Sequence, residues 1–282
     1  SAPDFMRIGV LVSFIAAENK LSKTTGNLNQ LTKGAIKRAL QNSRFKGNYG
    51  QTLTLLSPPG LKAGRLLLVG IGKVNKLDVL SAQQLGGTIY NSVSMSGDKS
   101  AGVFIEPIEG SKLSTSDLAA NIAYGCYLRS YRFDKYRTQE KLEDKPSVTN
   151  VTLLLEDFLH SRKKFAPMRK VAEGVFLTRN LVSEPANIIF PISFVRRARS
   201  LTKLGVKLKV LDERKMEALG MGALLGVAQG SANSPRIMAL QWNGLPKHKN
   251  ERPIAFVGKG VTFDTGGISI KPSGGMEDMK GD

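Results

Sequence analysis

The run Arg65-Leu66-Leu67-Leu68-Val69-Gly70-Ile71 decides the fold class, because aliphatic and small residues in close succession are typical of a buried strand. Downstream, Ser81–Met95 has the apolar spacing of a helix, and Ala101–Ile105 is another short aliphatic run. Strand, helix and strand in succession predict a layered α/β domain.

The same alternation continues on both sides of this stretch. Further strands are expected at Arg7–Phe14, Gln51–Leu56 and Asn150–Leu155, and further helices at Leu31–Ala39 and Ser116–Arg129. Ser116-Asp117 is a candidate cap for the last of these helices. The pattern predicts a first α/β domain that spans residues 1–158.

The second half begins with a long helical pattern over His160–Val182, which Pro185 and Pro191 interrupt. After it we expect a helix at Ile192–Leu204, strands at Val206–Leu211 and Arg236–Trp242 around a glycine-rich segment, and a further buried strand at Arg252–Gly258. Residues 159–282 are therefore interpreted as a connecting helix and the first part of a second α/β domain.

Charge is the unusual bulk property of this chain. Its 41 basic and 23 acidic residues give a net charge of +18, although the 41% hydrophobic content is ordinary for a globular protein. The stretch from Lys20 to Lys76 holds eleven basic residues and no acid. Such a surface fits contacts with nucleic-acid phosphates, and a solvated basic surface is the simpler alternative.

No recognised nucleic-acid motif accompanies the charge. The segment Gly47-Asn48-Tyr49-Gly50 has the GxxG spacing of KH domains, but it runs straight into a strand-like segment and is interpreted as a turn. The single cysteine, Cys126, lies in an apolar helical pattern, where we expect inert packing. One cysteine and no apolar run of about 20 residues predict a cytoplasmic protein without a membrane span.

Several familiar catalytic motifs are absent. The run that ends at Gly72 resembles a dinucleotide turn, but Asn75 replaces the third glycine of GxGxxG, so no nucleotide cofactor is expected. There is no phosphate loop and no nucleophile elbow. The two histidines, His160 and His248, have charged, surface-like neighbours. Any catalysis is therefore expected to use carboxylates and lysines.

The glycine-rich segment Gly258–Asp282 supplies those groups. Lys259 and Asp264 follow the strand expected at Arg252–Gly258, and ligands of open α/β sheets gather at the carboxyl ends of strands. Lys271 follows among further glycines. A surface loop with solvated charges is the alternative, but lysines and carboxylates in so apolar a segment favour a site.

Gly258–Asp282 resembles the signature region of the leucyl (cytosol) aminopeptidase family of two-metal exopeptidases. Leu128–Tyr136, Asn180–Asn187 and Leu219–Ser231 are also similar to segments of that family, with Ser183 standing where the family has asparagine. The resemblance implies a macro-domain-like N-terminal α/β domain, a connecting helix and a catalytic α/β domain with a mixed sheet.

The resemblance also implies roles for individual residues. Lys259, Asp264 and Asp282 match the family's metal ligands. Lys271 matches the catalytic, substrate-binding lysine that polarises the scissile carbonyl. Met279 matches a wall of the first side-chain pocket, and Asp282 also meets the substrate's amine. A ligating lysine must be neutral, whereas Lys271 must stay protonated to stabilise negative charge.

By the same resemblance we expect two divalent ions per subunit, Mn²⁺ or Zn²⁺, peptide substrates with a leucine-like first residue, and a homo-hexamer arranged as a dimer of trimers. The family's Asn-Thr-Asp-Ala-Glu-Gly-Arg segment, whose arginine holds a bicarbonate, is missing. We therefore expect the N-terminal portion of a longer enzyme, without the full site. A nucleic-acid-binding protein that uses the basic N-terminal domain, or a purely structural subunit of the hexamer, are the alternatives.

Overall fold

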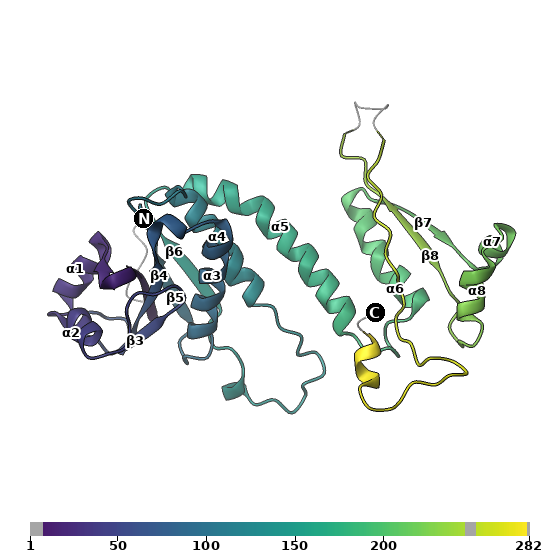
Figure 1. Cartoon of the computed structure of the whole chain (residues 1–282), viewed down its shortest axis with the longest axis horizontal. Coiled ribbons are helices and arrows are strands. Elements are labelled where there is room, and N and C mark those ends of the chain that lie inside the picture. The colour runs from purple at the N-terminus through teal and green to yellow at the C-terminus, as the bar shows by residue number, and fades with distance from the viewer. Residues whose placement is uncertain (1–7, 246–251, 281–282) are drawn as a thin grey trace. The chain divides into compact units, whose positions relative to one another are not determined.

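The computed structural model describes residues 8–245 and 252–280, which form two compact units (Figure 1). Unit 1 covers residues 1–176 and unit 2 covers residues 177–282. This division falls inside a long helix, whereas the sequence places the domain boundary between residues 158 and 159, which stays a prediction.

A mixed sheet forms the centre of unit 1. Its strands are β1 (Val10–Ala16), β2 (Lys20–Leu21), β3 (Thr52–Leu56), β4 (Arg65–Gly72), β5 (Ser100–Phe104) and β6 (Asn150–Leu154). The order is β3-β4-β1-β5-β6, with β2 paired to β1. β1 runs parallel to β4 and β5, whereas β3 is antiparallel to β4. The α/β fold class and the five strands expected in this unit are confirmed within the described residues.

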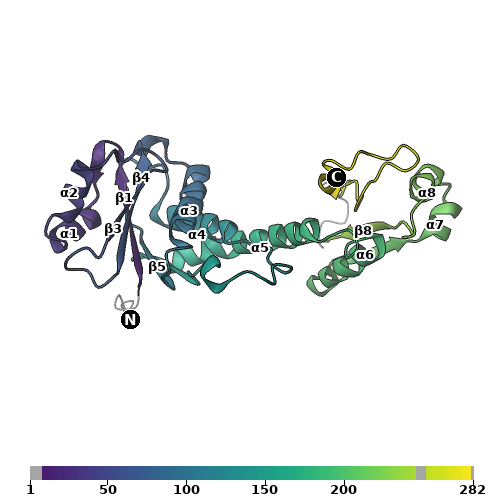
Figure 2. The same ribbon diagram turned by 90° about the horizontal axis from the view of Figure 1, so that it is seen from below.

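Helices cover both faces of the sheet (Figure 2). They are α1 (Lys23–Leu31), α2 (Ala35–Gln41), α3 (Val79–Val93) and α4 (Thr115–Arg129), with short 3-10 turns η2 (Ala17–Asn19), η3 (Val74–Lys76) and η4 (Leu142–Asp144). Alternate residues of β1 face the two layers: Val12 packs in the core of α3 and α4, and Ile15 in the core of α1 and α2. Strand β4 is buried almost throughout, as the apolar run predicts.

Two helix predictions need correction. The single helix expected over Leu31–Ala39 is wrong, because α1 ends at Leu31 and α2 begins at Ala35. Gly34 has a φ of 80° there, a left-handed conformation that a helix interior does not allow. The cap of α4 is Ser114 rather than Ser116-Asp117, since the Ser114 side chain accepts a hydrogen bond from the Asp117 amide.

Helices α3 and α4 pack closely because glycines stand at their contact. A Cβ on Gly125 would lie 1.8 Å from the carbonyl oxygen of Gln83, and one on Gly86 would lie 2.1 Å from that of Ile122. The buried Cys126 thiol donates to the Gly86 carbonyl oxygen at 3.1 Å, and burial raises its pKa to about 12. The thiol stays protonated, as expected for a packing residue.

Helix α5 (Phe158–Ser183) matches the helix expected over His160–Val182 and ends just before Pro185. In unit 1 its Phe176 ring packs against Tyr127 and Tyr131 of the preceding segment, with ring centroids 5.0 Å and 5.3 Å apart. None of the helices among the described residues has the length and apolar character needed to cross a membrane.

Unit 2 contains a small antiparallel sheet. Its elements are α6 (Pro191–Ala198), η5 (Arg199–Leu204), β7 (Lys207–Leu211), α7 (Glu213–Ala218), α8 (Gly222–Ala228), β8 (Ile237–Gln241) and η6 (Met276–Lys280). β7 pairs with β8. The strands expected at Val206–Leu211 and Arg236–Trp242 are thereby confirmed.

The buried strand expected at Arg252–Gly258 is wrong. This segment has no regular structure, and Ile254, Phe256 and Val257 are 84%, 95% and 99% exposed. A strand needs a neighbour for its backbone groups and cover for its side chains. In the described part of unit 2 the only paired strands are β7 and β8, so the segment has neither.

Candidate functional site

Three of the residues expected at a site lie together in unit 2. The Lys271 ammonium group donates to Asp264 Oδ2 at 3.0 Å and to Met279 Sδ at 3.1 Å. Lys271 and Met279 are thus in direct contact although they are eight residues apart in the sequence. The structure brings together the carboxylate, the lysine and the pocket residue that the sequence singles out.

A glycine turn returns the chain from Asp264 to Lys271. The Gly266 amide donates to Asp264 Oδ1 at 2.8 Å, and the Lys271 amide donates to the Thr265 carbonyl at 2.9 Å. Gly266 has a φ of 94°, and a Cβ there would lie 2.3 Å from the Ser269 carbonyl oxygen. Only glycine fits this position without strain, so a substitution of Gly266 would disrupt the turn.

Positive charge surrounds the Asp264 carboxylate. The hydrogen bond from Lys271 lowers the pKa of Asp264 most, followed by the bond from the Gly266 amide, and the charge of Lys259 adds to the effect. Asp264 is therefore ionised at neutral pH. Its side chain and that of Lys271 are partly open to solvent, 43% and 33% exposed, so a ligand has access to both.

A second cluster, which sequence reasoning missed, holds η6 to the end of α5. The Lys280 ammonium group donates to the Val182 carbonyl oxygen, and the side chain of Glu184, only 2% exposed, accepts from Arg197 Nη2 at 2.9 Å. Burial lowers the pKa of Lys280, and the Glu184 charge opposes that shift. Glu184 lies in Asn180–Asn187, which is similar to a segment of the aminopeptidase family. That similarity is the feature of the sequence that could have identified this residue.

The donor chemistry fits the beginning of a metal site. Asp264 offers an ionised carboxylate and Lys259 a nitrogen, but Asp282 lies outside the described residues. Among residues 8–245 and 252–280, no group of three or more histidine, cysteine, aspartate or glutamate side chains is placed to hold a metal ion. His160 is exposed and pairs with Asp157, and His248 also lies outside the described residues.

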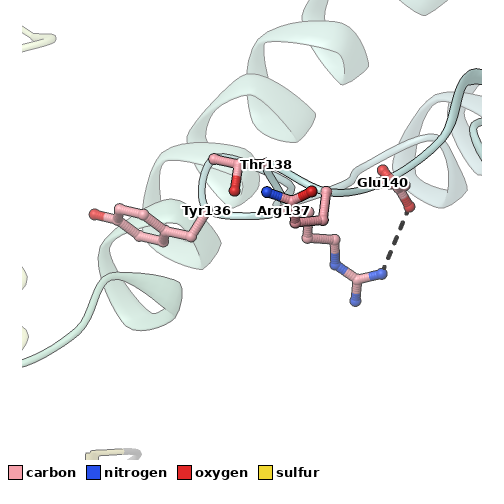
Figure 3. Close-up of a pocket in the computed structure, with 5 residues that line it drawn as sticks. Tyr136, Arg137, Thr138 and Glu140 are labelled. Atoms are coloured by element: carbon pink, nitrogen blue, oxygen red, sulfur yellow. Dashed lines mark ion pairs between the residues drawn. The ribbon is translucent and has the colours of Figure 1, made fainter.

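Outside these clusters, a hollow of about 370 Å³ lies on the loop before β6 in unit 1 (Figure 3). It is lined by the consecutive residues Tyr136 to Glu140, and Arg137 Nη1 lies 3.8 Å from Glu140 Oε1. A single loop thus supplies its whole lining. The contacts of these five residues indicate no function for the hollow.

Two domain models of one family match the chain. The N-terminal domain of the cytosol aminopeptidase family matches residues 10–140, and the catalytic domain of that family matches residues 176–282. The cluster of Asp264, Lys271 and Met279 falls within the second match.

Curated relatives have matching names. A probable cytosol aminopeptidase of Rhodopseudomonas palustris (strain BisA53) is 48% identical over 248 residues, which are 88% of this chain and 49% of that protein. One of Nitrobacter winogradskyi is 44% identical over 275 residues, or 97% of this chain and 54% of that protein. The chain therefore spans about half the length of the curated relatives it matches.

Solved structures agree on the fold. The bottromycin maturation enzyme BotP in complex with Mn has a TM-score of 0.72 and 25% identity, covering 97% of this chain and 52% of that one. A mutant of tomato leucine aminopeptidase also has a TM-score of 0.72, with 26% identity over 83% of this chain and 48% of that one.

Proposed function

The chain belongs to the cytosol aminopeptidase family, and on that premise we propose that it is part of a metal-dependent aminopeptidase that releases N-terminal, preferably leucine-like, amino acids from peptides. The observation that carries the proposal is the contact of Lys271 with both Asp264 and Met279, inside the segment matched by the family's catalytic domain. The names of the curated relatives and of the tomato enzyme support it.

The proposal includes a divalent-metal site with Asp264, Lys259 and Asp282 as ligands. The ionised state of Asp264 supports this, because carboxylate oxygens bind Mn²⁺ and Zn²⁺. The Mn complex of BotP is a second support. When bound, two such ions would supply Lewis-acid activation of water and of the scissile carbonyl. A bicarbonate ion held by an arginine outside this chain belongs to the same proposal.

The chain's own residues have distinct roles in this proposal. Lys271 holds a proton and presents its ammonium group to the oxygen on which negative charge develops. In the structure Asp264 holds this ammonium group in place, and the glycine turn fixes the distance between them. Met279 forms an apolar wall beside it for the first side chain of the peptide, and Asp282 orients the peptide's amine.

We place the protein in the cytoplasm, as the names of its relatives suggest, and propose a homo-hexamer built as a dimer of trimers. Peptides are its proposed substrates. Neither the family models nor the relatives named above support the alternative of a nucleic-acid-binding protein.

The test is made in a polypeptide that extends this chain to the length of its relatives. Lys271→Ala should lower kcat for leucine amide by about 10²–10³ and leave the metal content unchanged, since one oxyanion-stabilising donor is lost. Lys259→Ala should lower the metal content, measured by atomic emission. Lys207→Ala, on the exposed side of β7, is the control and should change neither. Metal loss on Lys271→Ala but not on Lys259→Ala would reverse the assignments.

A further inference from the structure

A hollow of about 460 Å³ lies in unit 1, at the carboxyl ends of β1 and β4, and takes no part in the function proposed above. Two sequence motifs without an assigned role meet in its lining. The GxxG segment supplies Asn48 and Tyr49, and the strand run that lacks the third dinucleotide glycine supplies Ile71 and Gly72. The turn after β4 and the start of α3 complete the lining with Lys73, Lys76, Asp78, Leu80, Ser81 and Gln84.

The position in the sheet is one at which α/β folds bind ligands. The chain passes from β1 to β4 on one side and later from β4 to β5 on the other side of β1. At such a reversal of strand order, the connections leave in opposite directions and open a crevice outside the carboxyl ends of the strands. Ala17 follows β1 and Lys73 follows β4, and both line the hollow.

The wall formed by the 47–50 turn is rigid because glycines bring this turn against the strand ends. A Cβ on Gly70 would lie 2.1 Å from the Asn48 carbonyl oxygen, and one on Gly47 would lie 2.0 Å from that of Ala16. The Gly72 amide donates to the Gly47 carbonyl at 2.9 Å, and the Gly50 amide donates to the Gly70 carbonyl at 2.9 Å. The hollow is therefore preformed rather than assembled by a mobile loop.

The charged side chains in the lining favour the binding of an anion. Lys73 directly precedes the η3 turn and Lys76 ends it, and within the described parts of the chain neither side chain has a hydrogen bond or ion pair. The carboxylate in the lining is already engaged: Asp78 caps α3 and accepts hydrogen bonds from the amide of Ser81 at 2.8 Å and from its hydroxyl at 2.7 Å. Two ammonium groups thus lie at the rim without a counter-charge in contact.

The rest of the lining suits an organic group. The Tyr49 ring is 43% exposed, and its hydroxyl, 2.9 Å from both Gln84 Oε1 and the Ser81 carbonyl, fixes the ring against the start of α3. Leu80, which also lines the hollow and is 62% exposed, offers an apolar surface. The volume of about 460 Å³ is within the range of about 300–1,000 Å³ that small-molecule sites occupy.

We propose that this hollow binds a small organic phosphate, with the phosphate group between Lys73 and Lys76 and the organic part against Tyr49 and Leu80. A phosphate monoester carries a charge of about −1.5 to −2 at neutral pH, which two ammonium groups balance. A carboxylate carries one charge and would leave one lysine unmatched. Binding here requires neither metal nor peptidase activity, so its test is independent of the proposed function.

The test is calorimetric titration of the chain with adenosine monophosphate, ribose 5-phosphate, inorganic phosphate and adenosine. At least one organic phosphate should bind ten times more tightly than inorganic phosphate, and adenosine should bind more weakly than its monophosphate. The double variant Lys73→Ser/Lys76→Ser should weaken the organic phosphate at least tenfold, because both counter-charges are removed. Tyr49→Leu should bring the affinities for organic and inorganic phosphate within about threefold of each other.

The matched control is Lys37→Ser/Lys62→Ser, which removes the same charge from exposed positions outside the lining and should change the affinity less than twofold. An equal loss in both double variants would mean that general positive charge attracts the ligand, and would overturn the proposal. The proposal would also be overturned if no organic phosphate bound at concentrations up to about 5 mM. That limit corresponds to a binding free energy of about −3 kcal/mol. Far-UV circular dichroism of each variant establishes that the fold is retained.

Discussion

The apolar runs Leu66–Ile71 of unit 1 and Ile254–Val257 of unit 2 are alike in composition but not in surroundings. Leu66 and Val69 are 0% exposed, whereas Phe256 and Val257 are 95% and 99% exposed. β4 has strands on both sides and helices over both faces, but the second run has no paired neighbour among the described residues. An aliphatic run is thus a strand only where other segments supply its hydrogen bonds and its cover.

The largest expected effect concerns the aminopeptidase activity proposed above, because the chain spans about half the length of its curated relatives. We expect no detectable leucine-amide hydrolysis by the 282-residue chain with added Mn²⁺, Zn²⁺ or Co²⁺ at mildly alkaline pH, because no complete ligand group exists among the described residues. The control is the same chain extended to the length of its relatives. Activity of the two forms within about tenfold, about 1.4 kcal/mol of barrier, would contradict the two-metal assignment.

Truncation of one side chain in each run compares their energetics directly. Leu67→Ala, in a site 2% exposed, should lower the free energy of unfolding by about 2–5 kcal/mol, because it leaves a cavity in the core. Val257→Ala, in a site 99% exposed, should change it by less than about 0.5 kcal/mol. Urea denaturation followed by circular dichroism measures both. Equal losses would show that the second run is packed in solution.

Substitution of one glycine in each unit compares how closely the backbone of the two units is packed. Gly125→Ala should destabilise unit 1 by about 1–3 kcal/mol, because its Cβ would lie 1.8 Å from the Gln83 carbonyl oxygen. Gly258→Ala is the matched change in unit 2, where no atom lies within 4 Å, and should be neutral. Hydrogen exchange of the α3 and α4 amides reports the first effect. Unchanged protection in Gly125→Ala would mean that the two helices separate easily.

The smallest expected effect concerns pH and Asp117 of unit 1. Its carboxylate lies 2.5 Å from Lys164 Nζ, and the hydrogen bonds from Lys164 and Ser114 lower its pKa. A carboxyl with a lowered folded-state pKa contributes stability that is fully present above its unfolded pKa and is lost as pH falls through the folded one. Asp117→Asn should therefore cost less than about 1 kcal/mol at pH 7 and almost nothing near pH 2. A loss that is independent of pH would assign the effect to helix capping alone.

The sequence predicts most of unit 1 because its signals are local. A run such as Arg65–Ile71 carries its own evidence of burial, and the structure places it in the sheet with matching bounds. The break at Gly34 escaped prediction because the apolar spacing continues across it, and the two positive-φ residues, Lys33 and Gly34, leave that spacing unchanged.

The site of unit 2 was predictable as a set of residues but not as a geometry. Lys259, Asp264, Lys271 and Met279 stand out by chemistry and by resemblance, and the contacts of Lys271 follow from a turn whose φ angles no sequence pattern specifies. The burial of Glu184 could not be predicted either, because it depends on an ion pair with Arg197, which lies 13 residues further along the chain.

Because the Cys126 thiol is deeply buried, we expect the native chain to react very little with thiol-directed labels. Maleimides react with thiolates. The Cys126 thiol has a pKa of about 12 and is hydrogen-bonded to the Gly86 carbonyl, so almost no thiolate forms at neutral pH. Because Cys126 is the single cysteine of the sequence, a thiol introduced by Ile268→Cys, at a fully exposed position, would be the one that reacts. A fluorophore or spin label could then report on the 252–280 segment while the native cysteine stays in place.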